Sequence, residues 1–232
     1  MLVIREKCMF VTNLKTTMKK LFISLVLIVF SSMAIAQYNN RDGNRIGISG
    51  GVSQCTLFTS NFTAKSANGY AGGLSVRGNY YNNWSMIYGM QFFVNNFSLE
   101  SNFKNDINYS LSGVQVRLLM SYNIIQDHIS VDFGPVLQIN GKMAVNGGDE
   151  NKTIGGTLLK ATDIVDVSKI NGNAYIGISA GGKVVRALVF YQYGFTNVFG
   201  NLNHQDNLSL LNGNKSFKGN IGSINGQLII NL

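Results

Sequence analysis

Apolar and polar residues alternate along eight stretches of the chain, from Arg45 to Leu232. Successive side chains of a β-strand point to opposite faces, so strict alternation places the apolar residues of a stretch on one face. The gaps between the stretches are alternately long and short. Transmembrane β-barrels combine strands of about 9–11 residues with tight turns at one end and longer loops at the other. The pattern predicts an all-β fold, an eight-stranded antiparallel up-and-down transmembrane β-barrel.

The alternation also places each predicted strand along the chain. The approximate ranges are 45–57, 70–80, 84–95, 113–123, 129–140, 173–180, 189–195 and 223–232. In the third strand every second position from Trp84 to Val94 is apolar or aromatic, whereas Ser85, Gln91 and Asn95 lie on the other face. We expect the apolar face of each strand to point outward to lipid and the small polar face to point into the lumen.

A soluble eight-stranded barrel of the lipocalin type is the alternative fold, with its apolar faces turned inward around a ligand. Such a barrel needs charged residues on its outer face, but the polar faces here carry mainly Gly, Ser and Asn. A narrow polar lumen inside an apolar exterior fits this composition better. The membrane interpretation requires that side chains such as Met90, Leu118 and Ile230 lie exposed on the outer wall.

The N-terminal segment has a different pattern, which predicts a secretory signal. A basic start at Met18, Lys19 and Lys20 precedes an apolar core over residues 21–30 and the small-x-small sequence Ala-Ile-Ala at 34–36. We expect residues 1–36 to be a cleaved signal peptide, with residues 1–17 as a spurious extension ahead of Met18. The apolar run of about 15 residues is shorter than the roughly 20 of a spanning helix. Residues 37–232 would then form one outer-membrane β-barrel domain.

Charge and cysteine content exclude several classes of function. The first 36 residues hold five of the 19 Lys and Arg residues and one of the 11 Asp and Glu residues, so the remainder has a formal charge of +4 instead of +8. These charges are scattered singly and form no patch typical of nucleic-acid binding. Cys55 is the single cysteine of residues 37–232, so no internal disulfide can form there. We expect Cys55 to be a wall residue and not a nucleophile.

Candidate catalytic residues are few and poorly placed. A hydrolytic site needs a nucleophile beside a base, usually histidine. The two histidines are predicted at opposite ends of the barrel, His128 in a periplasmic turn and His204 in the last outer loop. Asp206 and Ser209 follow His204 closely, but all three belong to one Asn-rich loop. The sequence therefore predicts no enzyme, and it predicts neither a metal site nor a cofactor.

Three charged residues are predicted to face the lumen, namely Arg77, Arg117 and Asp132. Because a buried charge needs a partner, we expect Asp132 to pair with one or both arginines across the interior. The interior of an eight-stranded barrel is just wide enough to be filled by its own side chains. We therefore expect a plugged lumen, and the alternative is a narrow anion-selective pore lined by the arginines.

Two predicted outer loops, about 143–171 and 199–220, are too long for simple hairpins, and loops of that length are usually functional or disordered. The first has nearly balanced charge, and Ile154 together with residues 158–167 gives it an apolar stretch. This stretch could fold over the barrel mouth or dock an envelope protein. The alternative is that these segments simply extend the strands above the membrane.

Residues 191–198 have the sequence Tyr-Gln-Tyr-Gly-Phe-Thr-Asn-Val. They resemble the aromatic-x-Tyr-Gly-Leu-Thr-Asn-Ile stretch on the penultimate strand of the PorT-like outer-membrane β-barrel family of diderm bacteria. Phe133-Gly134-Pro135 is similar to its Gly-Pro on the fifth strand, and residues 46–52 resemble its first strand. The residues that carry the two stronger motifs are Gly134, Pro135, Tyr193, Gly194, Thr196 and Asn197.

The resemblance covers residues 45–232 and implies residence in the outer membrane, with no common reaction and a link to protein secretion in some members. One departure is the last residue, Leu232, where such barrels usually have an aromatic residue. We expect a monomeric barrel in outer-membrane lipid with a structural or interaction role. A narrow solute channel and a membrane subunit of a secretion or envelope-assembly machine remain as alternatives.

Overall fold

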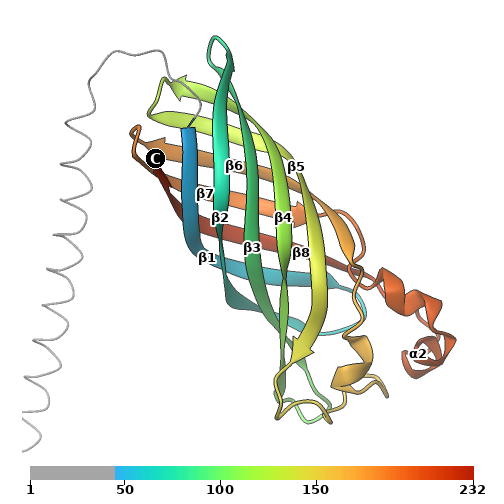
Figure 1. The fold of residues 1–232 in the computed structure, drawn as a ribbon. Helices are drawn as coiled ribbons and strands as arrows, with labels where there is room; N and C mark the ends of the chain where they lie inside the picture. The colour runs from blue at the N-terminus through green and yellow to red at the C-terminus, as the bar shows by residue number, and fades with distance from the viewer. Residues whose placement is uncertain (1–44) are drawn as a thin grey trace, which may run out of the picture. The chain divides into compact units, whose positions relative to one another are not determined.

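The computed structural model describes residues 45–232, and the predicted signal peptide at 1–36 lies outside the described residues. Eight strands form a closed barrel in the order β1-β2-β3-β4-β5-β6-β7-β8, and β8 pairs with β1 to complete the ring (Figure 1). Every neighbouring pair is antiparallel. The predicted eight-stranded antiparallel barrel is therefore confirmed.

The strands are β1 (Arg45–Thr59), β2 (Ala64–Tyr81), β3 (Trp84–Glu100), β4 (Asp106–Ile125), β5 (Ile129–Val145), β6 (Ile170–Gly181), β7 (Val185–Gly194) and β8 (Gly219–Asn231). Three short helices follow in the last two loops, η1 (Ala161–Ile164), η2 (Gly200–His204) and α2 (Asp206–Leu211). Within residues 45–232, no helix is long and apolar enough to cross a membrane.

The two ends of the barrel differ in the length of their connections. The turns β2–β3, β4–β5 and β6–β7 are tight and lie at the end that also carries the C-terminus (Figure 1). The loops β5–β6 and β7–β8, with their short helices, lie at the opposite end. We call these the short-turn end and the loop end.

The first two long gaps predicted from the sequence are largely strand, which corrects those boundaries. β2 begins at Ala64 instead of residue 70, β3 continues to Glu100, and β4 begins at Asp106 instead of residue 113. The connections β1–β2 and β3–β4 are consequently short. Strands β2 to β5 thus extend beyond the predicted lipid-facing segment. The alternative that residues 143–171 and 199–220 simply extend the strands is not what the structure shows, because most of these two segments is loop with short helices.

The extended strands were missed because the alternation changes sides along them. In the middle of β4, Val116 and Leu118 point outward and are exposed, while Gln115 is buried inside. Closer to the loop end of the same strand, Ile107 and Tyr109 are buried inside the barrel, and the outward positions are polar. The apolar face is therefore outside in one half of the barrel and inside in the other.

The single proline of the chain lies within β5, directly after Gly134. A side chain at Gly134 would not fit, because its Cβ would lie 2.4 Å from the Leu118 carbonyl oxygen and 2.9 Å from Leu119 Cα on β4. The close β4 backbone therefore requires glycine at position 134. Pro135 faces outward opposite Ala174 of β6.

Candidate functional site

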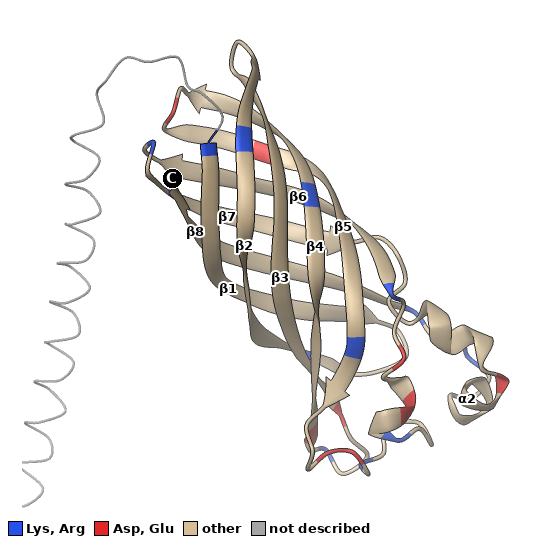
Figure 2. Ribbon diagram, in the orientation of Figure 1, with Lys and Arg blue, Asp and Glu red and all other residues tan. Residues whose placement is uncertain are grey.

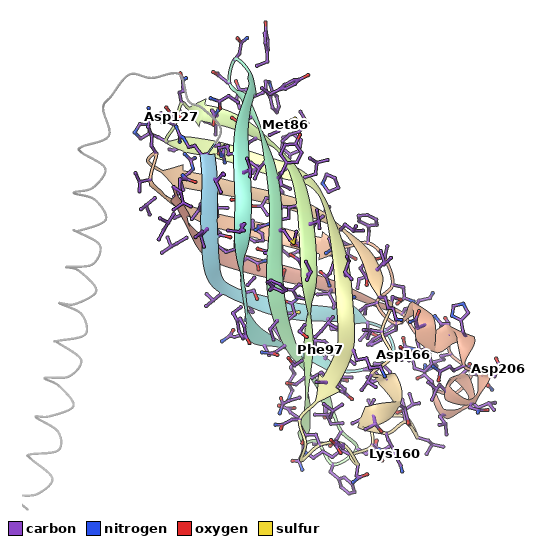
Figure 3. The ribbon with its side chains drawn as sticks, in the orientation of Figure 1. Met86, Phe97, Asp127, Lys160, Asp166 and Asp206 are labelled. Atoms are coloured by element: carbon purple, nitrogen blue, oxygen red, sulfur yellow. The ribbon has the colours of Figure 1, made fainter. Side chains whose placement is uncertain are left out.

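The lumen is the candidate functional site, since it holds the charged residues that the sequence placed inside. Its contents change from the short-turn end to the loop end in four layers. We call them the charged layer, the apolar ring, the amide belt and the outer core. Figure 3 shows the two extremes, with Asp127 at the short-turn end and Phe97 toward the loop end.

The charged layer is built around Asp132 of β5, which is completely buried. Arg77 of β2 crosses the lumen to it, with Nη2 3.4 Å from each carboxylate oxygen. Ser121 and Ser130 donate hydrogen bonds to Oδ1 of the same carboxylate. The structure thus brings Arg77 and Asp132 together, and hydroxyl groups complete the solvation that a buried charge requires.

Arg117 of β4 lies deeper and does not reach Asp132. Its Nη2 donates to Gln91 Oε1 at 2.6 Å, and its Cζ lies 5.6 Å from the centre of the Phe190 ring. A guanidinium over an aromatic face is a favourable cation–π contact, and it is stronger when water is excluded. Of the three predicted lumen charges, only Arg77 and Asp132 therefore form a direct ion pair.

A further lumen arginine, Arg186 of β7, was not singled out from the sequence. It donates to the backbone oxygen of Asp127 at 2.8 Å and to Ser179 Oγ at 3.1 Å. Arg45 bridges to Asp127 at 3.1 Å at the edge of the same layer. Arg186 was missed because the predicted seventh strand begins at residue 189, whereas β7 begins at Val185, and because the inward face of β7 mixes arginine with apolar residues. Its even position, shared with the inward Leu188 and Phe190, is the signal that could have identified it.

The apolar ring separates the charged layer from the amide belt. Tyr175 and Phe190 stack with ring centroids 4.5 Å apart. The ring consists of Ile87, Leu119, Val136, Tyr175, Leu188 and Phe190, all buried. Val136, which breaks the polar pattern on the inner face of β5, is thus part of an apolar layer to which β3, β4, β5, β6 and β7 contribute.

The amide belt is a continuous chain of hydrogen bonds around the lumen. Gln227 of β8 donates to Gln91 (3.1 Å), Gln91 to Gln115 (2.7 Å), and Gln115 to Gln138 (2.8 Å). The chain continues from Gln138 to Asn140 (2.7 Å), Asn171 (2.6 Å) and Thr196 Oγ1 (2.7 Å). Because each amide from Gln91 to Asn171 both donates and accepts, neighbouring bonds polarise one another, and the belt holds strands distant in sequence at a fixed spacing.

The outer core fills the barrel toward the loop end and includes residues from both long loops. Phe97 of β3 stacks on Tyr109 of β4 at 5.6 Å, and the Tyr109 hydroxyl donates to the Ala161 carbonyl of η1 at 3.1 Å. Its largest buried members are Phe97, Leu99, Ile107, Tyr109, Leu111, Ile154, Leu159, Ile164, Phe199, Leu202 and Phe217. The apolar stretch of the first loop therefore packs into the barrel mouth. Cys55 is buried in the same core.

The residues of the Tyr-Gly-x-Thr-Asn motif organise the end of β7. Asn197 accepts hydrogen bonds from the backbone of Phe199 (3.1 Å) and Gly219 (2.8 Å) and donates to the Phe217 carbonyl (2.8 Å). Thr196 accepts the last bond of the amide belt. A Cβ on Gly194 would lie 2.8 Å from the Asn173 side chain. These contacts give the motif an architectural role at the base of the last loop, while Tyr193 faces outward.

Other candidate groups are dispersed. His128 lies in the β4–β5 turn and His204 in η2, at opposite ends of the barrel. Among the residues that the structure describes, no group of three or more His, Cys, Asp or Glu side chains is arranged to hold a metal ion.

The outer wall carries a band of apolar side chains. Met90, Leu118 and Ile230 are 56%, 44% and 55% exposed, as the membrane interpretation requires. Charged residues are sparse on the barrel wall and more frequent in the loops (Figure 2). Since a closed ring of strands leaves no unpaired backbone edge, this band can face hydrocarbon. The chain therefore has the architecture of a bacterial outer-membrane β-barrel.

No protein-family model matches the chain, and no curated protein matches its sequence. Several solved structures are similar in fold. Neisserial surface protein A (NspA) is 12% identical over 82% of this chain and 99% of its own, with a TM-score of 0.47. Ail of Yersinia pestis is 13% identical over 82% of this chain and 100% of its own, with a TM-score of 0.47. The outer membrane protein OprG from Pseudomonas aeruginosa is 8% identical over 83% of this chain and 95% of its own, with a TM-score of 0.43.

Proposed function

We propose that the protein is a monomeric outer-membrane barrel whose lumen is closed by its own side chains and whose role is structural or in protein interaction. The observation that carries this proposal is the sequence of four side-chain layers across the lumen. Two cavities in and beside the charged layer measure about 10 and 20 Å³. That is room for single water molecules and not for a continuous file of solutes.

Planar-bilayer recording tests the closed lumen. We expect no stepwise conductance from the folded protein, because a solute would have to displace the amide belt and the outer core. Arg117→Ala should behave in the same way. Stepwise currents that disappear in Arg117→Ala would support the alternative, a narrow pore lined by arginines, and would refute the plug.

An interaction role is favoured by the loop end. The loops β3–β4, β5–β6 and β7–β8 are joined by backbone hydrogen bonds, from Asn102 to Thr153 (3.1 Å) and from Leu158 to Leu211 (3.2 Å). They nevertheless leave Phe103, Leu158 and Leu210 strongly exposed. A contiguous exposed apolar patch is typical of a protein contact surface, and we propose that these three side chains, held by joined loops at one end of the barrel, form one.

We infer that an envelope protein binds at these exposed loop residues, and the resemblance to PorT-like barrels makes a secretion or envelope-assembly machine one candidate. Affinity capture from detergent-solubilised membranes should return a stoichiometric partner. The triple variant F103S/L158S/L210S should lose it, while a variant of the exposed turn residue Tyr81 at the other end should keep it. Capture of no stoichiometric partner would leave a purely structural role.

The proposed location assumes that residues 1–36 direct export and are then removed. Mass spectrometry of the protein from fractionated membranes should identify Gln37 as the first residue in the outer-membrane fraction. Unheated samples should migrate in gel electrophoresis at a different position from boiled samples, because a closed barrel resists unfolding by detergent. A chain that retains residues 18–36 would contradict the signal-peptide proposal without affecting the barrel.

A further inference from the structure

We propose that the charged layer binds one small monoatomic anion, of the halide class, between Arg77 and Arg186. The first observation is an imbalance of charge. Arg77, Arg117 and Arg186 enter the described part of the lumen from β2, β4 and β7, and Asp132 is the carboxylate that lies among them. Arg77 forms the ion pair with that carboxylate. The described partners of Arg186 are neutral oxygen atoms of Ser130, Ser179 and the Asp127 backbone.

The second observation is an unused donor on Arg186. The residue is only 3% exposed, yet its Nε has no hydrogen-bond partner within residues 45–232. A buried donor without a partner costs the desolvation energy of the group, and the cost is larger when the group is charged. A ligand that accepts a hydrogen bond and carries negative charge would satisfy the Nε donor and offset the buried positive charge of Arg186.

The third observation is the space beside this donor. Arg77 and Arg186 line both small cavities. The one of about 10 Å³ is also lined by Arg45 and Asp127, and the one of about 20 Å³ by Arg117, Asp132 and Tyr175, so that arginines outnumber carboxylates in each. A single water molecule or a monoatomic ion fits a volume of this size. Phosphate and sulfate need more room than a halide ion does. The geometry therefore selects a halide over the polyatomic anions that arginine clusters often bind.

Thermal unfolding of the full folded barrel in detergent tests the site. Sodium chloride or bromide would be exchanged for sodium gluconate at constant ionic strength, and the midpoint followed by far-ultraviolet circular dichroism. A ligand that binds only the folded state raises the midpoint by roughly 3–5 °C for each ten-fold increase above its dissociation constant. We expect that rise with chloride and bromide, and none with gluconate.

The variants assign the effect to the site. Arg186→Gln should remove the chloride dependence, Arg186→Lys should weaken it because charge remains without the Nε donor, and Lys142→Gln, an exposed residue of β5, should retain it. In crystals soaked in bromide, an anomalous peak should lie between Arg77 and Arg186, a measurement that does not depend on variant stability. A chloride dependence that persists in Arg186→Gln, or bromide-soaked crystals without that peak, would overturn the proposal and leave water in the cavity. Neither outcome bears on the conductance test of the plug.

Discussion

The two halves of this barrel use the same eight strands with opposite polarity. From the short-turn end to the amide belt, apolar side chains cover the outside and the interior is largely charged or amide. From the amide belt to the loop end, the interior is an aromatic and aliphatic core, and outward positions such as Asn68, Asn108 and Ser112 are polar. The second half has the polarity of a soluble barrel.

This comparison shows that the surroundings, and not the hydrogen-bonded sheet, decide which face of a strand is apolar. Strand pairing runs without interruption from β3 to β4, from Trp84 opposite Tyr122 to Glu100 opposite Asp106. Along that ladder the outer face changes from residues suited to hydrocarbon to residues suited to water. The position of the change marks where the apolar band ends.

The largest expected effect comes from emptying the outer core. Phe97 and Phe92 lie on the same strand, but Phe97 is 1% and Phe92 70% exposed. Phe97→Ala should lower the free energy of unfolding by about 3–5 kcal/mol because it leaves a cavity. Phe92→Ala should cost clearly less, since lipid or detergent can fill the space. Denaturant unfolding of both variants in detergent measures the difference, and equal costs would mean that the outer half has no packed core.

The next effect tests the outer face. Leu118→Arg places a charge in the middle of the lipid-facing row of β4 and should cost about 2–4 kcal/mol in a lipid bilayer. Ser110→Arg on the same face of the same strand, beyond the apolar band, should be almost neutral. Reversible folding into vesicles provides the measurement. A similar penalty at both positions would extend the membrane over the whole length of β4.

A smaller effect is expected from the amide belt. Gln115→Leu leaves the Gln91 side-chain donor without its acceptor, which should cost about 1–3 kcal/mol of unfolding free energy. Gln54→Leu on the exposed face of β1 is the matched control and should change stability by less than about 0.5 kcal/mol. Should Gln115→Leu be as stable as the control, the belt would be a packing layer and not a hydrogen-bonded one.

The smallest effect concerns pH at the loop end. The Lys152 ammonium, 2.6 Å away, and the Asn108 backbone N–H, 3.0 Å away, lower the pKa of Asp149 below its ordinary value of 3.8. The stabilisation is therefore complete at neutral pH and is lost as the pH falls through this lowered pKa. Hydrogen-exchange protection of the Asn108 amide should decrease below about pH 4. Asp149→Asn, whose side-chain oxygen can still accept this hydrogen bond but does not titrate, should show protection without that decrease.

The number of strands and the facing of their middle portions could be predicted because lipid imposes an apolar residue at every second position. The additional length of strands β2, β3, β4 and β5 could not be predicted. Beyond the lipid the apolar residues lie on the inner face, so the alternation no longer continues the pattern of the middle portions. That Arg77 and Asp132 both face the lumen follows from whether their positions in the strands are odd or even. An odd or even position identifies the face on which a side chain lies, but not its distance along the barrel axis. It therefore did not separate Arg117, which is two residues from Leu119 of the apolar ring, from the charged layer.

The loops were predictable only in part. Their apolar residues indicated either a cover over the mouth or a docking surface, and the structure shows Ile154 and Ile164 buried while Leu158 is exposed. Sequence position alone does not tell which of these loop residues is buried and which is exposed, since burial depends on contacts with β3, β4 and the last loop. Arg186 was hidden for a comparable reason, because its neighbours Leu188 and Phe190 on the inner face belong to a different layer.

The lone buried thiol of Cys55 provides a direct reporter on the outer half. A maleimide can reach it only when the packing around Leu57 and the loops opens, so the rate of alkylation measures how often that region opens. Because the charged layer lies in the opposite half, reagent uptake should be insensitive to chloride until the whole barrel unfolds. The protection of this one sulfur atom from alkylation would therefore report the packing of the barrel mouth independently of the charged layer.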